Sequence, residues 1–107
     1  MIILANALSL QMLDLTKENT LKSVPMTTQE VKDALSTNNW ESAIGHEDTA
    51  NVLSSLLDTA IQMNRKSITL DTNTTLIVAQ VVGGRLPADS TRLPDGVQIV
   101  WVRINLI

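Results

Sequence analysis

One histidine stands out among the residues that can do acid–base chemistry at neutral pH. His46 is the only histidine in a chain of 107 residues that contains no cysteine, tyrosine or phenylalanine. Histidine is also the one side chain whose unperturbed pKa lies near neutrality. The next two residues, Glu47 and Asp48, are acidic, and an apolar helical pattern follows as far as Ala60. This order predicts that His46 lies at or beside a helix N-terminus, where free backbone N–H groups can bind an anion.

A histidine at the start of a helix can do chemistry, or it can simply cap and pack. A proton carrier beside unpaired N–H groups suits reactions in which an oxygen leaving a phosphate must be protonated. Gly45, just before the histidine, indicates a tight backbone at this point. Taken alone, this local pattern is more typical of a structural helix start, so both interpretations of His46 stay open.

Length and composition restrict the kind of protein. The 107 residues suffice for one domain, residues 1–107, with a modest core. Hydrophobic residues make up 44% of the chain, but only two are aromatic, so aliphatic side chains must build that core. The lack of cysteine excludes disulfides and thiolate chemistry and, with a single histidine, argues against a zinc site.

The sequence shows no sign of a membrane or secretory segment. No apolar run approaches the roughly 20 residues of a membrane span. The opening residues, Met-Ile-Ile-Leu-Ala, lack the basic region and the length of a signal peptide. We therefore expect a cytoplasmic protein that needs no cofactor and has no membrane partner.

The charge of the chain is weakly acidic and unevenly distributed. A net charge of −3 argues against stable binding of duplex nucleic acid through bulk charge. Residues 1–64 carry three lysines and eight acidic residues, whereas residues 65–107 carry one lysine, three acidic residues and all four arginines. A few arginines that converge in one pocket can still hold a small polyanion.

The order of apolar patterns predicts an α+β fold in which helices cover one face of a mixed sheet of about five strands. A capping box from Thr27 to Glu30 opens one helix, and Ser9 can cap a short one. Pro25 marks an edge strand or a strand end. Strands are expected at residues 2–5, 20–24, 67–70, 75–82 and 97–104, and the second main helix at residues 46–61.

Residues 66–82 have the pattern of a β-hairpin. Residues 67–70 alternate between apolar and polar, residues 71–74 form the turn, and residues 75–82 are almost continuously apolar. Such a run is typical of a central strand that is buried on both faces. Trp40 is expected to pack, and the last strand around Trp101 to serve either the core or a subunit interface.

Polar side chains that could bind a ligand collect at the ends of these elements. Adjacent strand ends and helix N-termini often share one rim, so these side chains are expected to meet. The arginine fork suits phosphate oxygens, and the amides can hydrogen-bond to a base or a ribose hydroxyl. Each also has an ordinary interpretation as a turn, cap or solvated residue. The candidates are Asn6, Ser9, His46, Arg65, Gln80 and Arg85.

The residue types favour phosphate chemistry without a metal. A metal-dependent phosphodiesterase needs several converging carboxylates or histidines, and Glu47 and Asp48 point in different directions from a first helical turn. An RNA 2′-hydroxyl, however, can attack its own phosphodiester. The protein must then hold the in-line geometry and protonate the departing 5′-oxygen, for which one histidine and one or two arginines suffice.

Two segments resemble a known family. Leu4-Ala5-Asn6-Ala7-Leu8-Ser9-Leu10-Gln11-Met12-Leu13 and Ala43-Ile44-Gly45-His46-Glu47-Asp48-Thr49 together resemble motifs of the viral type III anti-CRISPR ring nucleases. The spacing to Asn64-Arg65 and to Gln80…Arg85 agrees with that family. The resemblance covers nearly the whole chain and is weakest at residues 14–40 and 87–96.

The resemblance implies a twofold homodimer that binds cyclic tetra-adenylate across its interface. It implies metal-free cleavage to linear di-adenylate ending in a 2′,3′-cyclic phosphate, which antagonises type III CRISPR immunity. The family's usual acidic residue after the arginine has no match at its expected position, because Leu86-Pro87-Ala88 stands there and Asp89 comes one position late. The catalytic residues fall on His46 and Arg85, and the substrate-binding ones on Asn6, Ser9, Gln11, Gly45, Arg65 and Gln80.

Two other functions compete with the ring nuclease. A non-catalytic dimer of the same fold could hold a nucleotide or nucleic acid, and it would need the arginines but not the acid His46. A small transcriptional regulator is disfavoured by the acidic balance and by the lack of a basic recognition helix.

Overall fold

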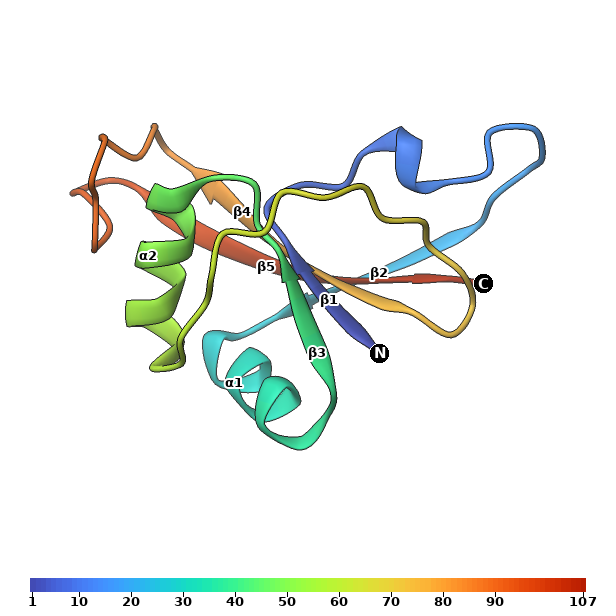
Figure 1. Cartoon of the computed structure of the whole chain (residues 1–107), viewed down its shortest axis with the longest axis horizontal. Coiled ribbons are helices and arrows are strands. Elements are labelled where there is room, and N and C mark those ends of the chain that lie inside the picture. The colour runs from blue at the N-terminus through green and yellow to red at the C-terminus, as the bar shows by residue number, and fades with distance from the viewer.

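The computed structural model describes all residues of the chain, 1–107, and contains one five-stranded sheet, two α-helices and a short 3₁₀ helix (Figure 1). The strands lie in the order β2-β5-β4-β1-β3, so β4 is the middle strand, as its apolar run predicts. The elements in chain order are β1 (Ile2–Ala5), η1 (Leu10–Met12), β2 (Leu21–Met26), α1 (Thr28–Thr37), β3 (Trp40–Ala43), α2 (Glu47–Leu57), β4 (Thr75–Val82) and β5 (Gln98–Leu106).

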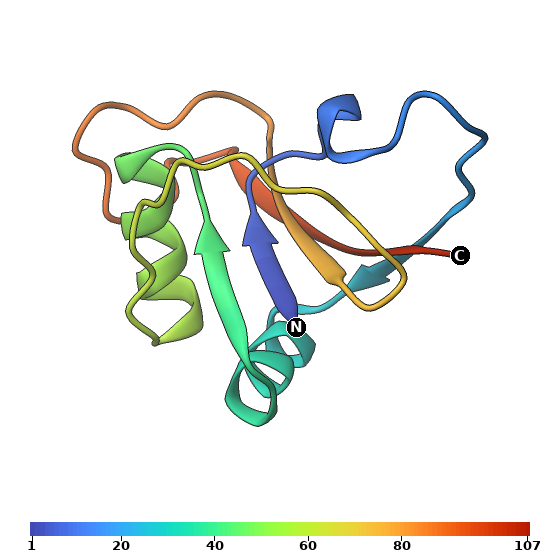
Figure 2. The same cartoon turned by 45° about the vertical axis from the view of Figure 1, so that its right-hand side comes forward.

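The sheet mixes parallel and antiparallel pairs. β1 runs parallel to β3 on one side and to β4 on the other, with Ile2 opposite both Trp40 and Thr75. β5 runs antiparallel to β4 and to β2. The expected α+β fold with a mixed five-stranded sheet is therefore confirmed. Because β1, β3 and β4 are parallel, their carboxyl ends point to the same edge, along which η1 and the loop after β4 also lie (Figure 2).

Both helices pack on one face of the sheet. The capping box predicted at Thr27 forms, since its side chain accepts the Glu30 N–H and the Glu30 carboxylate accepts the Thr27 N–H. Trp101 lies in the core of this face, where its indole N–H donates to the Thr28 hydroxyl. Trp40 packs against the same core, as expected. The buried members are Ile2, Leu4, Val31, Leu35, Ile44, Ala50, Leu53, Leu57, Ile61, Ile77, Ala79 and Trp101.

The other face of the sheet is covered by chain that forms no long helix. Successive residues of a strand point to opposite faces, so Leu76 and Val78 face away from α1 and α2. Met12 of η1 and the irregular segment around Ile68 and Leu70 pack over them. The first half of β4 is therefore buried on both faces, as its sequence predicts. The buried members of this second cluster are Ile3, Ala5, Leu70, Leu76, Val78 and Ile104.

Two expectations about strands were wrong. Residues 67–70 form no strand, so the hairpin predicted for residues 66–82 does not exist. Both edges of β4 are instead occupied by β1 and β5, and the segment lies across the second face, with the Leu70 N–H donating to the Met12 carbonyl at 2.8 Å. β3 was not expected. It is a four-residue edge strand of mixed composition, so it leaves little periodic signal.

Helix α2 begins where its sequence predicts and ends earlier. His46 is its N-cap residue, and Glu47 and Asp48 form the acidic first turn. The helix stops at Leu57 instead of Ile61, because Asp58 adopts a left-handed conformation (φ 50°). Ile61 still reaches the core, and its N–H donates to the Ser54 hydroxyl. The apolar residues that predicted a helix as far as Ile61 therefore continue past the end of α2 at Leu57, because Ile61 is buried without being helical.

One edge of the sheet is formed by β2, the strand that contains a proline. β2 pairs only with β5, so Pro25 lies in an edge strand, as predicted. β2 extends to Met26, two residues past the predicted end at Val24. None of the helices is long and apolar enough to cross a membrane.

Candidate functional site

The candidate residues gather along the edge where the parallel strands end. Asn6 follows β1 directly, Gly45 and His46 follow β3, and Arg85 comes three residues after β4. The N-terminus of α2 opens at the same edge, beside the loop that joins β4 to β5 (Figure 1). The expectation that these element ends share a rim is therefore met for Asn6, His46, Arg65 and Arg85, since Asn6 and Arg65 both contact Gly45.

His46 and Arg85 line one hollow of about 420 Å³, which we call the histidine hollow. Its walls come from the first turn of α2, the end of β4 and the following loop. His46 is exposed, and its side chain caps no backbone group of the helix. The imidazole is therefore accessible to a ligand. The residues that line the hollow are His46, Asp48, Thr49, Val81, Gly84, Arg85 and Leu86.

Gly45 is held from two sides by residues far away in the sequence. The Asn6 side-chain oxygen accepts the Gly45 N–H at 3.0 Å. Arg65 donates to the Gly45 carbonyl through Nε at 3.2 Å and through Nη2 at 2.7 Å. These contacts fix the peptide just before His46. The Asn6 amide nitrogen and the Arg65 Nη1 atom have no partner in the chain, so both can still donate to a ligand.

A second hollow of about 250 Å³ lies between η1 and the segment that follows Arg65, and we call it the lysine hollow. Ser9 and Gln11 line it, so these two candidates do not share the hollow of His46. Ser9 also caps η1 as predicted, accepting the Gln11 N–H at 3.3 Å. The lining residues are Ser9, Gln11, Met12, Lys66, Ser67, Ile68 and Thr69.

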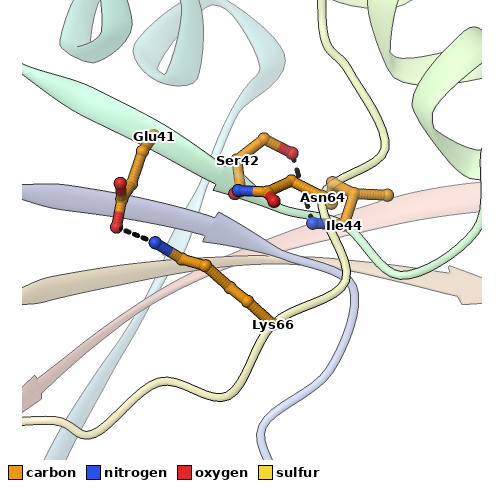
Figure 3. A network of polar contacts seen from close by, with 5 residues as sticks. All are labelled: Glu41, Ser42, Ile44, Asn64 and Lys66. Atoms are coloured by element: carbon orange, nitrogen blue, oxygen red, sulfur yellow. Dashed lines mark hydrogen bonds and ion pairs between the residues drawn. The ribbon is translucent and has the colours of Figure 1, made fainter.

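A polar network fastens the segment that carries Arg65 and Lys66 to the edge strand β3 (Figure 3). Asn64 donates through Nδ2 to the Ser42 carbonyl at 2.7 Å and through its backbone N–H to the Ile44 carbonyl at 2.8 Å. Lys66 forms an ion pair with Glu41 at 2.5 Å. Since Ser42 and Ile44 belong to the strand and turn that lead to His46, the same segment positions the histidine and the wall of the lysine hollow.

The loop between β4 and β5 closes the histidine hollow on its outer side. Gly83 needs to be glycine, because its φ is +88° and an added Cβ would lie 2.2 Å from the Gly96 carbonyl oxygen. The two ends of the loop therefore touch at its base. Further out, the Asp89 N–H donates to the Asp48 carboxylate at 2.8 Å.

Gln80 lies apart from the other candidates. Ile77, Ala79 and Val81 face α2, so the alternation of β4 turns Gln80 to the opposite face, where it is exposed. Its amide donates only to the Val81 carbonyl, at 3.2 Å. The structure thus brings His46 and Arg85 together, Ser9 and Gln11 together, and Gln80 with neither pair.

Sequence reasoning missed two residues of the hollows. Asp48 was taken only as a favourable charge in a first helical turn, and Lys66 was not considered. Neither has a sequence signal for its role, because the partners Asp89 and Glu41 are distant along the chain. Lys66 follows Arg65 directly, so only adjacency to a candidate could have drawn attention to it.

Few acidic side chains converge anywhere in the molecule. No three of the histidine and acidic side chains come close enough to hold a metal ion. The carboxyl group whose pKa is clearly displaced lies outside both hollows. Hydrogen bonds from the hydroxyl and the backbone N–H of Thr16 lower the pKa of Asp14, which is fully exposed in the loop after η1.

Comparisons with known proteins match the chain to proteins of Sulfolobus viruses. B116 of Sulfolobus turreted icosahedral virus shares the fold, with a TM-score of 0.75 at 19% identity over 96% of this chain and 97% of that one. Uncharacterized protein 26 of Sulfolobus islandicus filamentous virus (isolate Iceland/Hveragerdi) is 40% identical over 55 residues, which are 51% of this chain and 47% of that protein. The match thus spans about half the length of that viral relative. A model of the STIV B116-like family matches residues 2–96, and the chain belongs to this family of small viral proteins.

Proposed function

We propose that the protein is a metal-independent ring nuclease that cleaves cyclic tetra-adenylate and so antagonises type III CRISPR immunity in the cytoplasm of an infected cell. The observation that carries the proposal is the pairing of His46 with Arg85. They are far apart along the chain, yet they line one hollow at the N-terminus of α2. The imidazole can protonate the leaving oxygen, and the guanidinium can stabilise charge on the phosphate. The free N–H groups at the helix N-terminus can bind the phosphate as well.

The reaction is an internal transfer at one phosphate of the ring. The 2′-oxygen of an adenosine attacks the neighbouring phosphorus, and its proton passes to solvent. The bond from phosphorus to the 5′-oxygen breaks, and the imidazolium of His46 gives its proton to that oxygen. A 2′,3′-cyclic phosphate and a free 5′-hydroxyl remain, so no water is consumed in this step. Two such cuts at opposite phosphates yield two linear di-adenylates.

The other residues would hold the substrate in line. The Arg85 guanidinium binds phosphate oxygens and stabilises the charge that develops on them in the transition state. Arg65 and Asn6, which already fix the Gly45 peptide, have donors left for a phosphate or a ribose. Ser9, Gln11 and Gln80 would contact the more distant parts of the ring.

We expect the active species to be a twofold homodimer. Each chain offers one histidine, in a hollow of about 420 Å³, whereas the ring presents four phosphates. A twofold pair of chains would set two copies of His46 against opposite phosphates, matching the symmetry of the ring. Sedimentation with and without ligand tests this, and a monomer in both states at micromolar concentration would contradict it.

The decisive experiment is incubation of the protein with cyclic tri-, tetra- and hexa-adenylate in EDTA, followed by product analysis. We expect cleavage of the tetra-adenylate to continue in the chelator and to end in a 2′,3′-cyclic phosphate. Activity that is lost in EDTA and restored by a divalent metal would overturn the metal-free mechanism. Tight binding with no product from any ring would support the non-catalytic binding protein instead.

A further inference from the structure

The loop between β4 and β5 is fastened to α2 by one side chain. The Asp48 carboxylate accepts the Asp89 N–H at 2.8 Å across 41 positions of the sequence. The other hydrogen bonds of the loop are internal, such as those from the backbone and hydroxyl of Ser90 to the Pro87 carbonyl. Apart from its base at Gly83 and Gly96, the loop is therefore hydrogen-bonded to the rest of the chain through Asp48.

The fastened stretch includes Arg85, one of the two residues to which the proposed function gives a catalytic role. Arg85 lies between the base at Gly83 and the contact at Asp89, and its neighbour Leu86 is half-buried in the wall of the histidine hollow. Asp48 lines the same hollow, two residues after His46. One carboxylate thus joins the helix turn that carries the histidine to the loop that carries the arginine.

We propose that Asp48 is a positioning residue that holds the β4–β5 loop on the first turn of α2 and keeps Arg85 beside His46. This inference rests on the proposed function for its catalytic consequence, but the anchor itself is a property of the free protein. Asp89 adopts a left-handed conformation (φ 60°), and its backbone N–H is the loop donor to the Asp48 carboxylate. The contact is therefore specific to one backbone group.

The identity of the side chain allows a sharp test of this role. The negative charge of Asp48 is favourable in the first turn of a helix, so a test must separate that charge from the hydrogen bond to the loop. Asp48→Asn keeps an oxygen acceptor and removes the charge, whereas Asp48→Ala removes both. Glu47→Ala is the matched control, because Glu47 is an exposed acid of the same first turn, whereas the hydrogen bond to the loop belongs to Asp48.

The experiment measures two quantities in the wild-type protein and in the three variants. Amide hydrogen exchange of residues 85–92 reports on the anchor, and single-turnover cleavage of cyclic tetra-adenylate, beside a separate binding titration, reports on Arg85. For Asp48→Ala we expect exchange of the loop amides to rise about tenfold and the single-turnover rate to fall by a similar factor. Asp48→Asn should restore most of both, and Glu47→Ala should change neither.

The outcomes separate this proposal from the proposed function. Unchanged loop exchange in Asp48→Ala overturns the anchor, as does an Asp48→Asn variant that is as impaired as Asp48→Ala. Faster exchange with a wild-type cleavage rate overturns the link to Arg85. If the wild-type protein cleaves no ring, the proposed function fails, and the exchange of the loop amides still decides whether Asp48 anchors the loop.

Discussion

Two of the three hollows of this protein contain candidate residues, and the two differ in chemistry. The histidine hollow combines a titratable imidazole with a guanidinium at the N-terminus of a helix. The lysine hollow offers hydroxyls, an amide and an ammonium that is already paired with Glu41. Arg65 and Lys66 are adjacent in sequence but have different roles, since Arg65 holds the turn before His46 and Lys66 lines the lysine hollow.

This difference suggests a division of labour between bond cleavage and binding. Only the histidine hollow places a group that can donate a proton near neutral pH beside a permanent cation. In the proposed reaction, the lysine hollow would hold polar parts of the ligand and would not protonate the leaving oxygen. Substitutions in the two hollows should therefore affect the rate of cleavage and the affinity for substrate in opposite proportions.

The largest effect is expected from His46→Ala. Loss of the general acid should slow single-turnover cleavage by about 10²–10⁴-fold while leaving binding of cyclic tetra-adenylate mostly intact. The measurement is a single-turnover time course beside a binding titration on the same preparation. A wild-type cleavage rate in this variant would show that His46 is not the general acid. The proposed functional difference between the two hollows would then be wrong.

Arg85→Ala should impair both binding and cleavage. Its guanidinium can hold the ground-state phosphate and also stabilise charge that develops in the transition state, so we expect about a 10²-fold loss of rate together with weaker binding. Arg92→Ala is the control, because it removes the same charge from a residue that lines neither hollow. Equal losses in both variants would show that general charge, and not position, matters.

The histidine hollow was more predictable than the lysine hollow. His46, Gly45 and the acidic first turn are adjacent in sequence, so helix rules place them together. Arg85 follows the strong apolar run of β4, which ends at the same edge. The position of Gln80 could not be inferred in the same way. Its side chain faces one side of the sheet or the other according to where the helices pack, and the sequence of β4 does not show this.

The fold shows the same contrast between local and distant determinants. The capping box at Thr27 and the run of β4 act through neighbouring residues, and both elements form as predicted. The segment 67–70 alternates like a strand, yet β1 and β5 occupy both edges of β4, so the segment becomes a cover over the sheet. Strand pairing is decided by competition among distant segments, which no local pattern reports.

Arg65→Ala should weaken binding more than it slows the chemical step. The side chain can contact substrate, but it also donates twice to the Gly45 carbonyl, so its loss loosens the turn before His46. We expect binding to weaken about tenfold and the single-turnover rate at saturation to fall only a few-fold. A loss confined to the chemical step would assign Arg65 to the catalytic group of the histidine hollow instead.

Gln11→Ala should give the smallest effect and the clearest test of the lysine hollow. The Gln11 side chain makes no hydrogen bond in the chain, and the cap of η1 uses only its backbone N–H, which alanine keeps. Loss of one neutral contact to substrate should therefore weaken binding by about three- to tenfold and leave the saturated single-turnover rate unchanged. Thr72→Ala, in the exposed turn before β4, is the matched control and should change neither quantity. If Gln11→Ala lowers the saturated rate instead of the affinity, the lysine hollow takes part in the chemical step and the division of labour between the hollows is wrong.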